Sequence, residues 1–295
     1  MTAQLLVDAK ARLGECVLWC ELSNALYWTD IEGSSLSCWH AANGRVQQWT
    51  LPQRIGSFAL CHGTSRLLVG LASGIALFDT TSETLSPVVP VEPEHPTTRI
   101  NDGRCDTQGR FVFGMFNQAA DGVSIGHFYR VHADMTVERL PLPQASVGNS
   151  IAFSPDGTTL YYTDSPTRTI YCASYFADGR IGSPRQYVRL SASEGYPDGS
   201  TVDADGGLWN AQWQGGCVVR YDSSSHESAR FPIPASQPTC VAFGGALLDQ
   251  LYVTSARIGL SEYALGMEPQ PGGVFVLRPG WQGLPEHRFS CAQGQ

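Results

Sequence analysis

Short apolar runs separated by turn-forming residues recur along the whole chain, and residues 196–213 (YPDGSTVDADGGLWNAQW) show the pattern most clearly. Asp198 opens this stretch, Asp203 follows five residues later and Gly206 eight residues later, just before an apolar pair. A turn is favoured here, because Gly accepts positive φ and Asp can bond its own backbone. The stretch therefore predicts a strand, a turn and a second strand.

The same frame occurs six times along the chain, which is the mark of a repeat architecture. Its first positions are separated by 42, 44, 48, 49 and 41 residues, and they are Glu15, Ser57, Asn101, Asn149, Asp198 and, with the loosest match, Thr239. We expect these first positions to be structurally equivalent. Four of them carry Glu, Asn, Asn and Asp, so oxygen-bearing side chains recur at one place in the repeat.

Each repeat contains three or four short apolar segments, such as CVLWC, ALYWTDI, SLSCWH and RVQQWTL in the first, and none shows sustained helical periodicity. Four short strands every 40–50 residues are typical of a β-propeller blade, because such units bury their faces only when they are stacked around an axis. We therefore predict an all-β, six-bladed propeller with four antiparallel strands per blade, in one domain over residues 1–295. The predicted blades are approximately 14–52, 55–90, 98–143, 147–190, 197–234 and 238–278, the last completed by 3–8.

The segment Leu5–Asp8 has no hairpin partner nearby. We expect it to lie beside Val274–Leu277 as the outer strand of the last blade, which would close the ring and remove an exposed edge. The alternative is a frayed N-terminus. Because the first strand of a propeller blade lines the central channel, the six frame positions are expected to meet at one channel mouth.

Composition narrows the class of protein. The net charge is −8, with 18 Arg, a single Lys and no basic block, which disfavours nucleic acid and anionic membranes as partners. No apolar run approaches the ~18 residues of a membrane span, and the N-terminus lacks the pattern of a signal peptide. Nine Cys without a CxxC pair indicate buried thiols in a reducing compartment. We predict a cytoplasmic protein that is a monomer or a weak homodimer.

Glu15, Asn149 and Asp198 suggest a metal site. Two carboxylates and an amide oxygen suit a hard divalent cation such as Ca²⁺ or Mg²⁺, with Mn²⁺ or Zn²⁺ as alternatives. Three protein ligands would leave positions open for water and substrate, and a cation would relieve the repulsion between the acids. Each residue alone is more commonly a turn residue or a cap. Their shared register favours one divalent-cation site.

Arg99 and Asn101 flank the third frame position in TTRINDG. A guanidinium and an amide can bind the carbonyl and hydroxyl oxygens of a polar substrate. The alternatives are that Arg99 pairs with a carboxylate such as Asp102, and that Asp102 only forms the turn. The sequence contains no GxSxG elbow, no phosphate-binding glycine loop and no His pair at metal-ligand spacing. Most Trp are expected in the core, although Trp213 is close enough to reach the channel mouth.

Six segments resemble one family in order and over nearly the whole chain: GECVLW, RINDGRCDTQGRFVFG, GNSIAFSPDGTTLYYTDS, YPDGSTVDADGGLWNAQW, FGG and LYVTSARIGLS. They are similar to the senescence marker protein, gluconolactonase and luciferin-regenerating enzyme family. The resemblance implies a six-bladed propeller and a metal-dependent lactonase that opens a sugar-acid lactone, such as a glucono-, galactono-, arabino- or xylonolactone. By motif position, Glu15, Asn149 and Asp198 match the metal ligands, Arg99 and Asn101 match the substrate-binding pair, and Asp198 also matches the acid/base residue.

Two departures from the family pattern stand out. Ser150 occupies a position where Gly is common after the Asn, and Gly114–Gln118 reads GMFNQ where many members have Gly-Thr-Met. A Glu that some relatives place just beyond falls near Ala119, which leaves the choice of sugar open. A calcium-binding regulatory propeller without turnover is the main alternative function, although no DxDxDG loop occurs. A scaffold propeller would need no polar cluster in register, and a strictosidine-synthase-like propeller gives no reason for Glu15 and Asp198.

Overall fold

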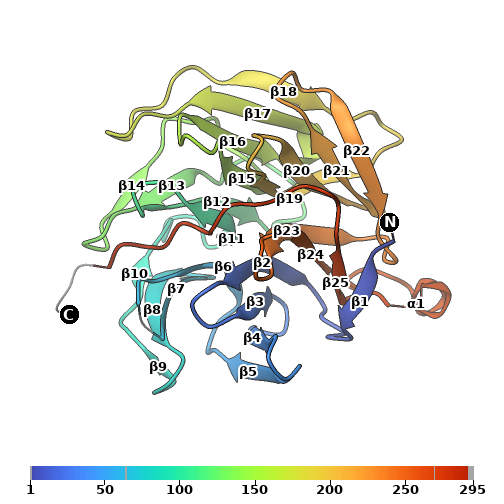
Figure 1. The fold of residues 1–295 in the computed structure, drawn as a ribbon. Coiled ribbons are helices and arrows are strands. Elements are labelled where there is room, and N and C mark those ends of the chain that lie inside the picture. The colour runs from blue at the N-terminus through green and yellow to red at the C-terminus, as the bar shows by residue number, and fades with distance from the viewer. Residues whose placement is uncertain (1, 64, 269, 292–295) are drawn as a thin grey trace.

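Six small antiparallel sheets are arranged in a ring around a central axis, so the fold is the predicted six-bladed β-propeller (Figure 1). The computed structural model describes residues 2–63, 65–268 and 270–291. The first blade consists of β2 (Gly14–Cys20), β3 (Ala25–Asp30), β4 (Ser35–His40) and β5 (Val46–Thr50). The second consists of β6 (Ile55–Leu60), β7 (Arg66–Leu71), β8 (Gly74–Asp79), β9 (Thr84–Leu85) and β10 (Val89–Pro90). The third consists of β11 (Thr98–Cys105), β12 (Phe111–Asn117), β13 (Phe128–Val131) and β14 (Val137–Arg139).

The remaining blades follow the same order from the axis outward. The fourth consists of β15 (Gly148–Phe153), β16 (Thr159–Asp164), β17 (Thr169–Ser174) and β18 (Arg185–Arg189). The fifth consists of β19 (Tyr196–Val202), β20 (Leu208–Trp213), β21 (Cys217–Tyr221) and β22 (Glu227–Pro232). The sixth consists of β23 (Pro238–Gly244), β24 (Gln250–Ser255), β25 (Val274–Leu277) and β1 (Gln4–Val7). Helical structure in the described part of the chain is limited to the short turns η1 (Ser165–Thr167) and α1 (Glu262–Met267). None of the helices described there is long or apolar enough to cross a membrane.

The N-terminal strand closes the ring as predicted. β1 pairs antiparallel with β25, with Leu5 opposite Phe275 (Figure 1). The last blade therefore contains strands from both ends of the chain, and its outer edge is covered.

The second blade differs from the predicted four strands. Its outer edge consists of two two-residue strands, β9 and β10, which both pair with β8. Pro87 lies between them and has no N–H to donate, so a continuous ladder cannot form across it.

The hydrophobic core lies between neighbouring blades. Leu36 of the first blade packs in one cluster with Phe58 and Val69 of the second, and all three are fully buried. The inner strands approach one another closely around the axis: a Cβ added to Gly56 would lie 2.0 Å from the carbonyl oxygen of Ile100. A glycine is therefore required at this contact between β6 and β11.

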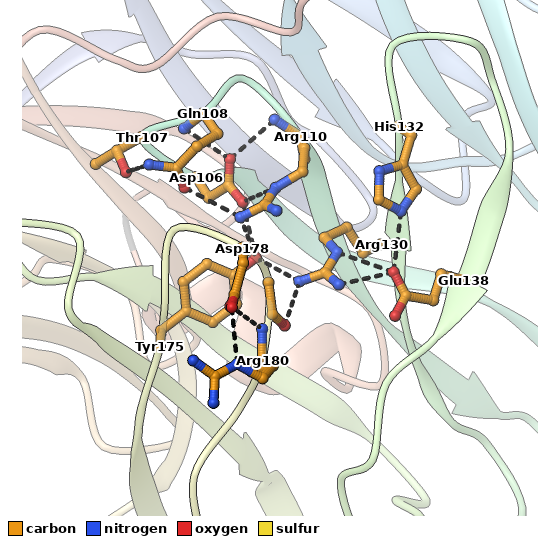
Figure 2. Close-up of polar contacts among 11 residues, drawn as sticks. Asp106, Thr107, Gln108, Arg110, Arg130, His132, Glu138, Tyr175, Asp178 and Arg180 are labelled. Carbon is orange, nitrogen blue, oxygen red and sulfur yellow. Dashed lines mark hydrogen bonds and ion pairs between the residues drawn. The ribbon is translucent and has the colours of Figure 1, made fainter.

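Polar contacts also join neighbouring blades, as Figure 2 shows for residues of the third and fourth. The hydroxyl of Tyr175, which follows β17, donates to Asp106 Oδ2 at 2.7 Å and accepts from Arg130 Nη1 at 3.0 Å. Arg130 also pairs with Glu138 at 2.7 Å. Because Asp106 is fully buried, the tyrosine and Arg110 supply the hydrogen bonds that its carboxylate needs.

The segment after β25 crosses the ring and was not expected from the sequence (Figure 1). Its Phe289 is fully buried and donates its N–H to Leu60 O at 2.8 Å, while Glu286 forms an ion pair with Arg104. Arg104 lies near the end of β11, whereas Arg99 lies near its start. The C-terminal segment therefore contacts the end of the ring away from Arg99.

Candidate active site

Every inner strand carries a register shift beside its frame position. In β2 the shift falls between Glu15 and Leu18, and in β15 it falls between Asn149 and Ala152. In β11 it falls between Ile100 and Gly103, so Asn101 lies one step further along the bulge than Glu15 does. The frame positions are therefore equivalent to within one residue rather than identical. A bulge re-aims its side chains, which is how strand positions are commonly directed into a site.

A cavity of about 360 Å³ lies at one end of the ring and is lined from the bulged strands β2, β11, β15 and β19. The frame positions Ser57 and Thr239, which were expected at the same mouth, are not among its lining residues. All five side chains predicted from the sequence line it: Glu15, Arg99, Asn101, Asn149 and Asp198. Trp213, which the sequence places close enough to reach the channel mouth, also lines the cavity, whereas Trp209 is fully buried in the core. The other lining residues are Leu13, Glu32, Phe116, Val147, Ser165, Pro166, Tyr196 and Ile258.

A chain of hydrogen bonds links the amide side chains of the cavity. Asn101 Nδ2 donates to Asn149 Oδ1 at 2.8 Å, and Asn149 Nδ2 donates to Ser165 Oγ at 2.9 Å. Ser165 Oγ in turn donates to the carbonyl oxygen of Pro197 at 2.7 Å. This chain fixes which atom of Asn149 is its oxygen, and that oxygen keeps a second lone pair.

Arg99 is the buried cation of the cavity. Its Nη1 donates to Ile100 O at 2.9 Å and to Asn101 Oδ1 at 2.7 Å, and its guanidinium lies 4.8 Å from the centre of the Phe116 ring. Burial lowers the pKa of Arg99 to about 10. Its Nε is buried without a hydrogen-bond partner among the described residues. An acceptor on a ligand would satisfy this donor.

Two carboxylates lie buried in the same cavity, with 9% of Glu15 and 6% of Asp198 exposed. Burial, and next the charge of Asp102, raises the pKa of Glu15 to about 8. Burial, and next the charge of Glu15, raises the pKa of Asp198 well above its usual range. No ion pair to either carboxylate is formed within the described residues. Two such acids become stable in the ionised form only beside added positive charge.

The donor set fits a divalent cation. Glu15, Asn149 and Asp198 bring two carboxylates and an amide oxygen to one cavity, and hard cations prefer oxygen ligands. The described residues contain no group of three His, Cys, Asp or Glu arranged to hold a metal. That finding agrees with a set whose third member is an asparagine.

The sequence reading missed two acidic residues of the site. Asp102 was interpreted as a turn residue or as the partner of Arg99, but its Oδ2 accepts from the N–H of Ile151 at 2.8 Å, and burial raises its pKa. Asp102 thereby joins β11 to β15 behind the cavity. Glu32 lies in the turn after β3 and lines the cavity. Only the order of blades around the axis could have placed it there.

The two departures from the family pattern, Ser150 and the segment 114–119, both lie at or beside the cavity residues. Ser150 has a φ of 58°, the left-handed region that glycine adopts without strain. Its Oγ donates to the carbonyl oxygen of Asp198 at 2.5 Å. In the segment 114–119, Phe116 lines the cavity and packs against Arg99.

The fold and the cavity together define a six-bladed propeller with a pocket at one end of its axis that brings carboxylate, amide and guanidinium groups together. The chain belongs to the SMP-30/gluconolactonase/LRE-like family, whose family model matches residues 13–257. It is 47% identical to an L-arabinolactonase of Azospirillum brasilense over 98% of this chain and 95% of that protein. It is 35% identical to a 6-deoxy-6-sulfogluconolactonase of Pseudomonas putida over 98% of this chain and 99% of that protein.

A solved structure agrees with the same family. The calcium-binding protein regucalcin of Agrobacterium tumefaciens superposes with a TM-score of 0.92 at 31% identity. The comparison covers 98% of this chain and 97% of that one. The fold is therefore shared over almost the full length of the chain.

Proposed function

We propose that this protein is a divalent-metal-dependent lactonase that hydrolyses a sugar-acid lactone to the open aldonate in the cytoplasm. The observation that carries the proposal is the cavity in which two buried carboxylates, an amide oxygen and an unsatisfied arginine donor meet. The names of the two lactonase relatives support a sugar lactone as the substrate class. The proposed substrate is an aldonolactone, such as glucono-, galactono-, arabino- or xylonolactone.

Glu15, Asn149 and Asp198 would hold one Ca²⁺, Zn²⁺, Mn²⁺ or Mg²⁺ ion. When bound, such a cation supplies Lewis-acid polarisation of a carbonyl and favours the ionised form of its carboxylate ligands. The hydrogen bond from Asn101 supports this assignment, because it holds the side-chain oxygen of Asn149 in a fixed position.

Asp198 is the proposed general base and general acid. Its carboxylate takes a proton from the attacking water as the water oxygen bonds to the carbonyl carbon. The bond between that carbon and the ring oxygen then breaks, and Asp198 returns the proton to the leaving ring oxygen. The reaction adds one water across one ester bond, and Asp198 ends in its starting state.

Arg99 and Asn101 are the proposed substrate-binding pair. The free Nε of Arg99 can donate to a lactone oxygen, and its charge favours an oxyanion. Both amide hydrogens of Asn101 already have acceptors in Asn149 and Gly148. Asn101 can therefore bind a substrate only as an acceptor, through the second lone pair of its Oδ1.

A panel of aldonolactones followed by pH-stat titration tests the proposal. Hydrolysis of at least one lactone should stop when the protein is treated with a chelator, and it should return when Ca²⁺, Zn²⁺, Mn²⁺ or Mg²⁺ is added back. The absence of hydrolysis by the metal-loaded protein would remove the enzyme assignment. Hydrolysis that is unaffected by the chelator would remove the metal from it.

A calcium-binding protein without turnover is the second candidate, favoured by the description of the regucalcin structure as calcium-binding. The same experiment separates the two functions. A ligand that binds the native state stabilises it whether or not the protein is an enzyme, so Ca²⁺ should raise the melting temperature under both functions. Such a rise without hydrolysis of any lactone would support calcium binding alone.

The organisation of the chain is a further part of the proposal. We propose that residues 1–295 form one domain and act as a monomer or weak homodimer, without nucleic-acid or membrane partners. The pairing of β1 with β25 supports one domain, since the last blade is incomplete without the N-terminal strand. A single cooperative unfolding transition and a monomeric mass by light scattering at low concentration are expected.

A further inference from the structure

Glu32 is an acidic cavity residue that the proposed reaction leaves without a role. It lies in the turn between β3 and β4 and lines the cavity together with Glu15, Arg99 and Asn101. Its side chain is 21% exposed, so it faces the solvent-filled part of the site rather than the core. A carboxylate so placed can contact a ligand directly.

The turn that carries Glu32 is held rigidly. The carboxylate of Asp30 accepts hydrogen bonds from the backbone N–H of Gly33 at 3.1 Å and of Leu13 at 2.9 Å. Leu13 lines the same cavity, so this contact fixes the turn relative to the cavity wall. A site residue on a fixed turn can discriminate between substrates, because it does not move to accommodate the wrong one.

Arg54 orients the Glu32 carboxylate. Arg54 Nη1 donates to Glu32 Oε1 at 3.1 Å. A carboxylate offers about four lone-pair positions, and this bond uses one of them. Glu32 is therefore held in place while it keeps acceptor capacity for hydroxyl groups.

The rest of the cavity makes Glu32 stand out as an acceptor. Much of the lining is apolar, with Leu13, Phe116, Val147, Pro166 and Ile258. Arg99 presents a donor to the ligand, and Glu32, which acts electrostatically on Arg99, lines the same cavity. Hydroxyl groups of a ligand find a charged acceptor there and little to bond along the apolar wall.

We infer that Glu32 is a specificity-determining residue whose carboxylate accepts hydrogen bonds from the hydroxyl groups of the lactone. This inference rests on the proposed lactonase function and narrows its substrate class to polyhydroxylated lactones, with deoxygenated rings as poor substrates. A site that binds a hydroxyl through a charged acceptor discriminates against the analogue that lacks it, because the acceptor is then desolvated without a partner.

The test compares two five-membered lactones, the hydroxylated L-arabinono-1,4-lactone and the unsubstituted γ-butyrolactone, in metal-loaded protein. Glu32→Ala should lower kcat/KM for the hydroxylated lactone by about 10–100-fold, mainly through KM, the usual worth of a charge-assisted hydrogen bond. The same variant should change kcat/KM for γ-butyrolactone by less than about twofold. If γ-butyrolactone is bound without turnover, its competitive inhibition constant replaces kcat/KM in the comparison.

Two further variants serve as controls. Glu32→Gln keeps an oxygen acceptor without the charge and should fall between the wild type and Glu32→Ala for the hydroxylated lactone. Asp249→Ala breaks the ion pair between Asp249 and Arg278, which is 3.0 Å long and lies outside the cavity lining. It should leave kcat/KM for both substrates unchanged. That result would show that losing a carboxylate paired with arginine does not by itself lower kcat/KM for the hydroxylated lactone.

Each outcome decides between the inference and the proposed function. An equal loss for both substrates in Glu32→Ala would assign Glu32 to the fold or to the cation and overturn the inference. Unchanged kinetics for both substrates would also overturn it, while the lactonase assignment would stand. If the wild-type protein hydrolysed no lactone at all, the proposed function would fall and the inference with it.

Discussion

Asn101 and Asn149 are joined by a 2.8 Å hydrogen bond from Nδ2 of the former to Oδ1 of the latter. The two residues lie on β11 and β15, the inner strands of neighbouring blades. The bond connects the proposed substrate-binding pair to a proposed metal ligand. Because Asn101 also accepts from Arg99 at 2.7 Å, the three side chains form one continuous unit. Arg99 and Asn101 should therefore differ in how their removal affects the cation.

Arg99→Ala should weaken turnover while metal affinity stays close to that of the wild type, because Arg99 is not a proposed ligand. Asn101→Ala should reduce metal affinity as well, by about 10–100-fold, since residues that orient a ligand commonly contribute that much. Isothermal titration calorimetry with the metal measures both effects. Asn43→Ala, which alters an exposed turn asparagine, is the matched control. Loss of metal binding in Arg99→Ala would show that Arg99 supports the site itself.

Asp198→Asn should lower the rate of lactone hydrolysis by about 10²–10⁴-fold, the usual worth of general acid–base catalysis. The substitution keeps an oxygen ligand but removes the proton acceptor. Metal content must be measured in the same sample, because a falling metal affinity would add to the loss. Near wild-type hydrolysis by a variant with an occupied metal site would remove Asp198 from the base role.

The metal-free protein should lose stability as the pH rises. The pKa of Glu15 is raised by burial to about 8 in the folded protein, against a usual value of 4.5. Between these values the folded state holds more protons than the unfolded state, so the free energy of unfolding decreases with increasing pH. Asp198, whose pKa is also raised, acts in the same direction. The stabilisation is complete below about pH 4.5 and is lost as the pH passes about 8.

Melting curves of chelated protein between pH 5 and pH 8 check this expectation. Addition of Ca²⁺ should raise the melting temperature more at pH 8 than at pH 5, because the ionised carboxylates bind the cation and the protonated ones do not. Glu15→Gln should flatten the pH dependence of the chelated protein. A melting temperature that rises with pH over this range in chelated wild-type protein would contradict the assignment.

The sequence predicted the ring, its closure by the N-terminal strand and the five cavity residues because each depends on a repeated local pattern. The frame around Glu15, Asn101, Asn149 and Asp198 recurs at nearly constant spacing, and a ring brings equivalent positions to one axis. The one-residue offset of Asn101 and Asp198 was not predicted, because a bulge leaves no clear mark in the sequence.

Other parts of the structure depend on contacts between distant segments. Glu32 stands in an ordinary turn sequence, and its place in the cavity follows from the arrangement of the blades around the axis, which the local sequence does not show. The C-terminal segment carries no strand pattern, yet Glu286 pairs with Arg104 across 182 positions of the chain. The division of the outer edge into β9 and β10 depends on Pro87, which the sequence did show. The positions of Glu32 and of the C-terminal segment could not be predicted from local sequence patterns. The division of the outer edge could have been predicted, because Pro87 lacks the N–H that a continuous strand needs.

Ser150 offers a test of how the backbone of Asp198 is held. Its φ of 58° disfavours any residue with a Cβ, whereas its hydroxyl donates to Asp198 O at 2.5 Å and accepts from Asn210 Nδ2 at 3.2 Å. Ser150→Ala keeps the strain and leaves the buried carbonyl with one donor fewer, so it should destabilise the protein by about 1–3 kcal/mol. Ser150→Gly loses the same hydrogen bonds but relieves the left-handed strain, and it should be more stable than Ser150→Ala by about 1 kcal/mol. Urea unfolding of the metal-free proteins measures the difference. A glycine variant less stable than the alanine variant would show that the backbone at residue 150 is not strained, and the hydroxyl alone would then explain why serine is tolerated there.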